Sequence, residues 1–130
     1  MKINYQNIYE KLGYLYYAIA AADKQVHPAE IEELRGLIAK EWLPLENSID
    51  KYGTDAAHYI SIAFEYLLSE GIPASEAYSV FADYYEQHTA AFSQELKKRI
   101  STTAAAIANA FAARNKNEQK YLDQLRRLLK

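Results

Sequence analysis

The stretch Ala18–Leu37 of this chain, AIAAADKQVHPAEIEELRGL, is repeated in outline 88 positions later as Ala106–Leu125, AIANAFAARNKNEQKYLDQL. The two copies align without a gap, and the positions that match are Ala18/Ala106, Ile19/Ile107, Ala20/Ala108, Ala22/Ala110, Glu30/Glu118, Leu34/Leu122 and Leu37/Leu125. Each copy reads as an alanine-rich helix, a short turn and a second amphipathic helix opened by a glutamate. Two such helical hairpins at opposite ends of the chain predict an all-α fold with internal pseudo-symmetry.

Local signals place the two helices of the first hairpin. Pro28 suits the first position of a helix, because its missing N–H would have no partner there, and this makes His27 the N-cap. That helix must end before Pro44, which disfavours helical geometry at the residue preceding it. The helix before it is predicted over about residues 5–22, where apolar residues recur at spacings of three and four: Ile8, Leu12, Leu15, Ile19 and Ala22.

The rest of the chain carries helix signals only, with neither a strand pattern nor a Gly/Ser-rich linker. The third helix is expected to begin after Thr54 and to end at Gly71 and Pro73. The expected first residues or N-caps of the next three helices are Ser75 or its neighbour, Ser93 and Asn115. We therefore expect residues 1–130 to form a single compact helical domain of about six helices, with hairpins at about 8–42 and 104–129. The two alanine-rich helices should be central and adjacent, since small side chains let helices approach closely.

The composition narrows the classes of function. The chain has no cysteine, which excludes disulfides, thiolate nucleophiles and cysteine-type zinc sites. The basic clusters at 97–99 and 126–127 are short and lack interleaved aromatic residues, so we expect no nucleic-acid partner. No apolar run reaches the length of a membrane span, and the first residues lack a signal-peptide pattern. These observations predict a cytoplasmic protein without a transmembrane segment.

The repeated glutamate has a structural explanation that needs no ligand. Glu30 and Glu118 each lie three residues after the expected N-cap, His27 or Asn115, which is the capping-box position. There a carboxylate also meets the positive end of the helix dipole. Asp23 is different, because an acid near the carboxyl end of a helix opposes the dipole unless it caps the turn or binds something. Asp23 is therefore the strongest single candidate for a functional residue.

The segment Ala20–Glu30, AAADKQVHPAE, followed by an amphipathic helix, resembles the signature of the TerB-like, tellurite-resistance family. That signature has Ala-Asp-Gly, a variable residue, an aliphatic residue, three further residues and a Glu. The resemblance covers the hairpin at 8–42 well and the copy at 104–129 weakly. The resemblance implies an all-helical, pseudo-symmetric fold. It also implies a role in a bacterial stress response, including tellurite resistance, with links to membrane-associated complexes and suspected binding of a divalent metal.

The resemblance also implies where a metal would bind. The family's acidic pair falls on Asp23 and Glu30 in the first copy, whereas in the second copy it falls on Phe111 and Glu118. The family glycine is replaced by Lys24, which places a cation beside the first site. The only cofactor that the resemblance implies is a divalent metal ion, which would be held by Asp23 and Glu30 and completed by His27 or Glu33.

No catalytic motif stands out, and we expect a non-enzymatic interaction or stress-response module that acts through a protein-partner surface. The polar contacts would come from the acidic first hairpin, including Glu32, and the aromatic anchors from tyrosines at helical spacing in the first helix: Tyr5, Tyr9 and Tyr16. The partner is predicted to be a protein, with a membrane-associated complex as one setting. The alternative is a divalent-metal sensor that uses acidic residues at the first helix–helix turn. A third class of function is a hydrolase with paired carboxylates.

Overall fold

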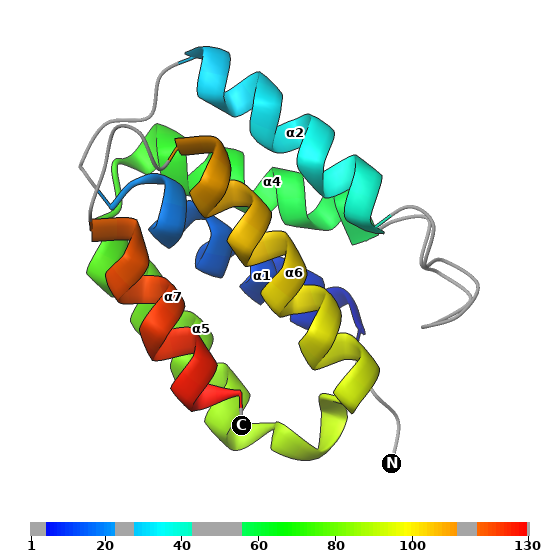
Figure 1. The fold of residues 1–130 in the computed structure, drawn as a ribbon. Helices are drawn as coiled ribbons and strands as arrows, with labels where there is room; N and C mark the ends of the chain where they lie inside the picture. Colours follow the sequence, from blue (N-terminus) through cyan, green and yellow to red (C-terminus); the bar gives the residue numbers. More distant parts are fainter. Residues whose placement is uncertain (1–4, 23–27, 43–55, 112–116, 130) are drawn as a thin grey trace.

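The computed structural model of this chain describes residues 5–22, 28–42, 56–111 and 117–129, and it is all-helical within them (Figure 1). The helices are α1 (Tyr5–Ala20), α2 (Pro28–Trp42), α4 (Ala56–Glu70), α5 (Ala74–Gln87), α6 (Gln94–Phe111) and α7 (Asn117–Leu128), with a short 3₁₀ helix η3 (Thr89–Ala91) before α6. The predicted all-α class is confirmed. The predicted boundaries at Pro28, Gly71 and Ser75 or its neighbour agree with these elements to within a residue or two.

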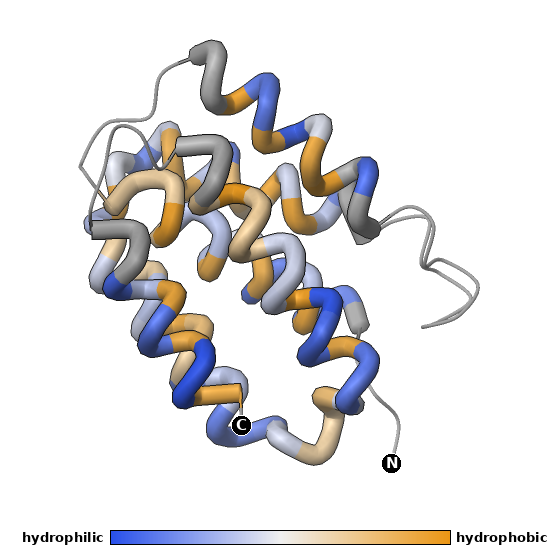
Figure 2. The backbone as a smooth tube through the Cα atoms, viewed as in Figure 1, coloured by the Kyte–Doolittle hydropathy of each residue, from blue (hydrophilic) through white to orange (hydrophobic). Residues whose placement is uncertain are grey.

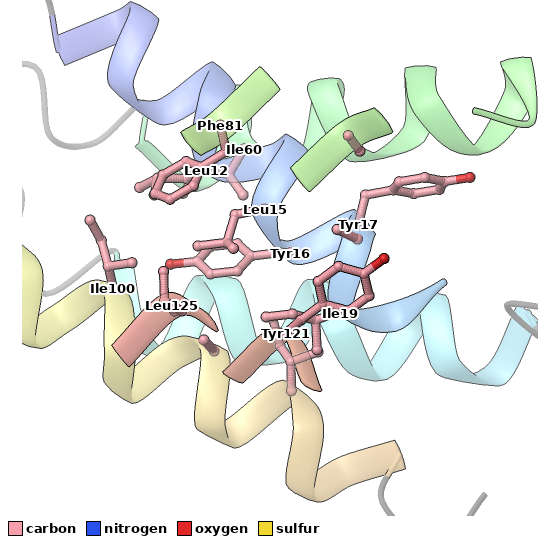
Figure 3. Close-up of a cluster of buried hydrophobic side chains, with 14 of the residues drawn as sticks. Leu12, Leu15, Tyr16, Tyr17, Ile19, Ile60, Phe81, Ile100, Tyr121 and Leu125 are labelled. Carbon is pink, nitrogen blue, oxygen red and sulfur yellow. The ribbon is translucent and has the colours of Figure 1, made fainter. Parts of the chain in front are cut away.

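Helix α1 lies at the centre of the fold. It packs against α4, α5, α6 and α7, and in Figure 1 it passes behind α6. Four residues of the predicted stripe, Ile8, Leu12, Leu15 and Ile19, are completely buried, and the fifth, Ala22, is partly buried just after the end of α1. Figure 3 shows side chains of α1 among core residues from the helices around it. The alanine-rich helices α1 and α6 are adjacent, as their small side chains predicted.

Gly13 sets the distance between α1 and α4. A Cβ atom added to Gly13 would lie 2.5 Å from the Cβ atom of Ala63 and 2.7 Å from the carbonyl oxygen of Ile60. Both distances are shorter than real contacts of a Cβ atom, so only glycine fits at this crossing. The close approach brings the exposed faces of α1 and α4 next to each other.

The turn between α4 and α5 is a Schellman motif. The N–H of Ile72 donates to the carbonyl oxygen of Leu67 over 3.2 Å, and that of Gly71 donates to Leu68 over 3.2 Å. Gly71 has φ of 64°, a left-handed conformation that glycine adopts without strain. The predicted stop at Gly71 is therefore confirmed, and α5 begins three residues later.

The start of α6 is also where the sequence placed it. The hydroxyl oxygen of Ser93 accepts a 3.1 Å hydrogen bond from the N–H of Leu96, three residues on. This is an N-cap interaction, which satisfies one donor of the first turn. The expected caps His27 and Asn115 lie outside the described residues.

The two copies of the repeat pack differently. Helix α7 packs beside α6, as a hairpin requires, whereas α2 packs on α6 and α4 (Figure 1). Helix α7 also contacts α1, so the second helix of each copy lies against the first helix of the other copy. Apolar and polar residues alternate along α2, α6 and α7 with the helical period, which gives each one an inward face (Figure 2).

Candidate functional site

The residues predicted to hold a metal are only partly within the described structure. Asp23 and His27 lie outside the described residues, and Glu30 is in the first turn of α2 without a described side chain. Glu33 is exposed on α2. Within the described ranges, no group of three or more His, Asp or Glu side chains is arranged to hold a metal ion. The metal-sensor alternative therefore stays a prediction from the sequence.

Two of the three tyrosines predicted as partner anchors are buried in the core. Tyr9 and Tyr16 are 2% and 0% exposed, and both belong to the core. The reason is the central position of α1, because neighbouring helices cover the side next to the apolar stripe as well as the stripe itself. Tyr5 begins α1, and its side chain lies outside what the structure describes. The rings of Tyr9 and Tyr16 are therefore not available to a partner.

Glu32 is exposed, but it takes part in an ion-pair group between two helices. The guanidinium of Arg35 lies 2.7 Å from the Glu32 carboxylate and also pairs with Glu65 of α4. All three side chains are well exposed, so the pairs add little to stability. The Arg35–Glu65 pair joins α2 to α4 and marks one border of the exposed face of α4.

Two large apolar side chains of the described structure are exposed, and both are on α4. Ile62 is 49% exposed and Tyr66 is 56% exposed. They are four residues apart, so they lie one above the other on the same face of the helix. Single exposed apolar residues are ordinary, but an adjacent pair on one helix face is a candidate contact surface.

Tyr14 of α1 extends this face. The pKa of Tyr14 is raised by burial, and further by the negative charge of Glu10 and by Tyr66, which places all three side chains close together. Tyr14 is half-buried and packs against the core. The ammonium of Lys11 lies 5.1 Å from the centre of the Tyr14 ring and 3.4 Å from the Glu10 carboxylate. The cation is thus held between an aromatic ring and an acid.

Tyr84 of α5 completes the surface on the other side of α1. Its ring centre lies 5.9 Å from the Lys11 ammonium and 4.1 Å from the His88 ring, which is stacked on it. Nδ1 of His88, in the tautomer that carries a proton there, donates to the carbonyl oxygen of Tyr84 over 2.9 Å. Burial raises the pKa of Tyr84, and Glu10 raises it further. We call Ile62, Tyr66, Tyr14 and Tyr84, with Glu10 and Lys11 between them, the tyrosine surface.

Helices α4 and α5 contribute only acidic charges around the tyrosine surface, whereas the neighbouring cations Lys11 of α1 and Arg35 of α2 are each paired with acids. Residues 52–96 contain seven acidic residues and no lysine or arginine, so α4 and α5 carry acids alone. Among the described residues, the lysines and arginines of the second half of the chain are instead on α6 and α7, as at Lys98 and Arg127. The exposed carboxylate of Glu70, one turn after Tyr66, forms no ion pair with any residue that the structure describes.

A separate hollow of about 500 Å³ lies beside the turn between α4 and α5. Its walls include Tyr17 and Tyr121, and the Tyr17 hydroxyl is already hydrogen-bonded to the Ile72 carbonyl oxygen. Apart from the two tyrosines and Ser75, its described walls are apolar or backbone. This hollow brings together no acid with a base or an activated nucleophile, which is what a hydrolytic site requires.

The exposed face formed by Ile62 and Tyr66 was missed in the sequence, because only the apolar stripe on the other side of the same helix was assigned. The inward residues of α4 are Ile60, Phe64 and Leu67, and all three are buried. At 100° per residue, Ile62 and Tyr66 fall on the opposite side of the helix from that stripe. Two large apolar residues off the core stripe are the pattern that marks a second contact face.

Comparisons with protein-family models, with curated proteins and with solved structures find no match. None of the described helices has the length and apolar character needed to cross a membrane.

Proposed function

We propose that this chain is a non-enzymatic interaction module that binds a protein partner through the tyrosine surface. The observation that carries the proposal is the exposure of Ile62 and Tyr66 on one face of α4, in a molecule whose other large apolar side chains, among the described residues, are buried or half-buried. Burial of such a pair against a partner removes apolar area from water and favours association.

The chemistry of the surface supports a protein partner. Tyrosine is enriched at protein interfaces because its ring supplies apolar contact while its hydroxyl can form a hydrogen bond. Tyr14 and Tyr84 are half-buried against the core, so they lose little side-chain freedom on binding. The surface lies on three packed helices, which makes it rigid before the partner arrives.

The resemblance of residues 8–42 to TerB-like proteins suggests a biological setting for this module. On that basis alone, the proposal extends to a bacterial stress response in the cytoplasm, with a membrane-associated complex as the assembly that contains the partner. The divalent-metal alternative would use Asp23 and Glu30, completed by His27 or Glu33.

Site-specific photo-crosslinking tests the proposal in cells that produce the chain naturally. A photoreactive phenylalanine analogue replaces Ile62 or Tyr66 in turn, and Lys98 of α6 or Arg127 of α7 in matched controls. We expect a discrete protein adduct from positions 62 and 66 that is absent from positions 98 and 127. Equal adducts from all four positions, or none from 62 and 66, would refute a partner on this surface.

A further inference from the structure

The acids around the tyrosine surface specify what kind of partner it fits. Glu70 lies on α4 one turn after Tyr66 and is exposed, and the neighbouring Glu65 shares the Arg35 guanidinium with Glu32, so that group keeps one net negative charge. Glu10 is paired with Lys11, whose ammonium lies 5.1 Å from the ring centre of Tyr14 and 5.9 Å from that of Tyr84. The only cation within the surface, Lys11, is already 3.4 Å from Glu10. A partner that covers the apolar pair therefore meets a rim of negative charge.

The arrangement of Ile62 and Tyr66 fits a helix. The two side chains are one turn apart along α4, which is 15 residues long and is covered on its other faces by α1 and α2. A partner helix with apolar residues at spacings of three and four presents the same repeat, so its ridge can pack along the exposed face of α4. An extended strand has no sheet edge to join among the described residues.

The charge also argues against other occupants. A second copy docked face to face about a two-fold axis would bring Glu65 and Glu70 close to their own equivalents, which is repulsive. An anionic membrane or a nucleic acid would be repelled for the same reason, since α4 and α5 contribute no lysine or arginine.

We infer that the tyrosine surface binds a basic amphipathic helix of a protein partner. Apolar side chains of that helix contact Ile62 and Tyr66, and its flanking lysines or arginines pair with Glu70 and with the Glu32–Arg35–Glu65 group, which carries one net negative charge. This inference rests on the proposed function, and it adds the shape and the charge of the partner. Because rim charges steer the encounter, the association is faster at low ionic strength and weaker at high salt.

The test uses the isotope-labelled full chain and three synthetic helical peptides of about 18 residues, long enough to span α4. The peptides share one leucine face and differ only in the flanking residues, which are lysine, glutamine or glutamate. Amide chemical shifts report where each peptide binds. We expect the lysine peptide to shift amides of α1, α4 and α5 and to bind about tenfold more tightly than the glutamine peptide, with the glutamate peptide weakest.

Two variants of equal charge separate a specific site from general attraction. Glu70→Lys lies beside Tyr66, whereas Glu86→Lys is on the side of α5 away from Tyr84, since two residues along a helix differ by about 200° in direction. We expect Glu70→Lys to weaken the lysine peptide about tenfold and Glu86→Lys to weaken it at most about twofold. Tyr66→Ser should abolish the shifts on α4 while the rest of the spectrum stays that of the folded chain.

The outcomes distinguish failure of the inference from failure of the proposed function. Equal affinity for the lysine and glutamine peptides at this surface would overturn the basic partner and leave the interaction surface in place. Equal weakening by Glu70→Lys and Glu86→Lys, or shifts that Tyr66→Ser does not change, would show general attraction and also overturn it. Failure of all three peptides to shift these amides would overturn the helical partner, while cross-linking at positions 62 and 66 decides the function independently.

Discussion

The hydroxyl of Tyr17 in α1 donates a 2.6 Å hydrogen bond to the carbonyl oxygen of Ile72, 55 residues later in the turn between α4 and α5. The bond joins the central helix to the Schellman motif that reverses the chain. The bond is part-buried, since Tyr17 is 4% exposed and its pKa is raised by burial, while Ile72 is half-buried at the wall of the hollow beside this turn. The contact therefore holds the start of α5 against α1, which is the arrangement that places Tyr84 beside Lys11.

Replacing Tyr17 with phenylalanine should lower the free energy of unfolding by about 1–2 kcal/mol, because the Ile72 carbonyl oxygen loses its partner in a part-buried place. Urea denaturation of both proteins measures the difference. Tyr66→Phe is the matched control, since the Tyr66 side chain is exposed and should change stability by less than about 0.5 kcal/mol. Equal effects of the two variants would contradict the role of this hydrogen bond.

Gly13→Ala should destabilise the fold by about 2 kcal/mol, although alanine is the better helix former, because the added Cβ collides with Ala63 and with the carbonyl oxygen of Ile60. Gly36→Ala in α2 is the matched control. Nothing lies within 4 Å of a Cβ atom added there, so helix propensity alone should stabilise by about 0.5–1 kcal/mol. Thermal and urea unfolding give both values, and a stabilising Gly13→Ala would refute the close approach of α1 and α4.

Alkaline pH should unfold the protein partly through Tyr78. Burial raises the pKa of Tyr78 to about 12, although Arg127 acts in the opposite direction. The folded state then holds this proton more tightly than the unfolded state, whose tyrosine titrates near its ordinary value of 10. The stabilisation is fully present below pH 10 and is lost as the pH rises towards about 12.

Ultraviolet titration of tyrosinate, compared between the wild type and Tyr78→Phe, should reveal one missing ionisation near pH 12. Unfolding free energies measured over the same pH range should fall less steeply in Tyr78→Phe. A missing ionisation near pH 10 instead would show that Tyr78 is not shielded next to Tyr121, whose ring centre lies 5.3 Å away.

The metal-sensor alternative makes its own prediction. Calorimetric titration of the metal-stripped protein with calcium, magnesium, manganese and zinc should then show saturable heat for at least one ion, and Asp23→Asn should remove it. Glu76→Gln removes a carboxylate from α5 and is the control for a general loss of negative charge. Absence of heat from every ion, with the fold intact, would eliminate this alternative.

The local parts of the fold could be predicted from the sequence because single residues determine them. Gly71 ends α4 through a conformation that suits glycine, and Ser93 begins α6 through its own hydroxyl. The burial of Tyr9 and Tyr16 could not be predicted in this way. It depends on how many helices surround α1, and that number is set by contacts between residues far apart in the sequence.

The candidate site could not be predicted from the sequence for a related reason. The middle of α4, from Tyr59 to Leu68, is almost uniformly apolar, so its composition does not show which face lacks a neighbouring helix. The exposure of Ile62 and Tyr66 follows from the positions of α1 and α2 on the other faces. The acidic rim was visible in the sequence, but its relation to these two residues needed the structure.

The contacts between the two copies of the repeat have a consequence for how the chain folds. Because α2 rests on α6, and α7 rests on α1 as well as on α6, each copy covers part of the apolar face of the other. Contacts between the two ends of the chain must therefore form before either end is stable, which makes folding slower and more cooperative than in a helical protein built from local pairs. Two separately produced half-chains should each remain unstructured and should regain helical structure only when they are mixed.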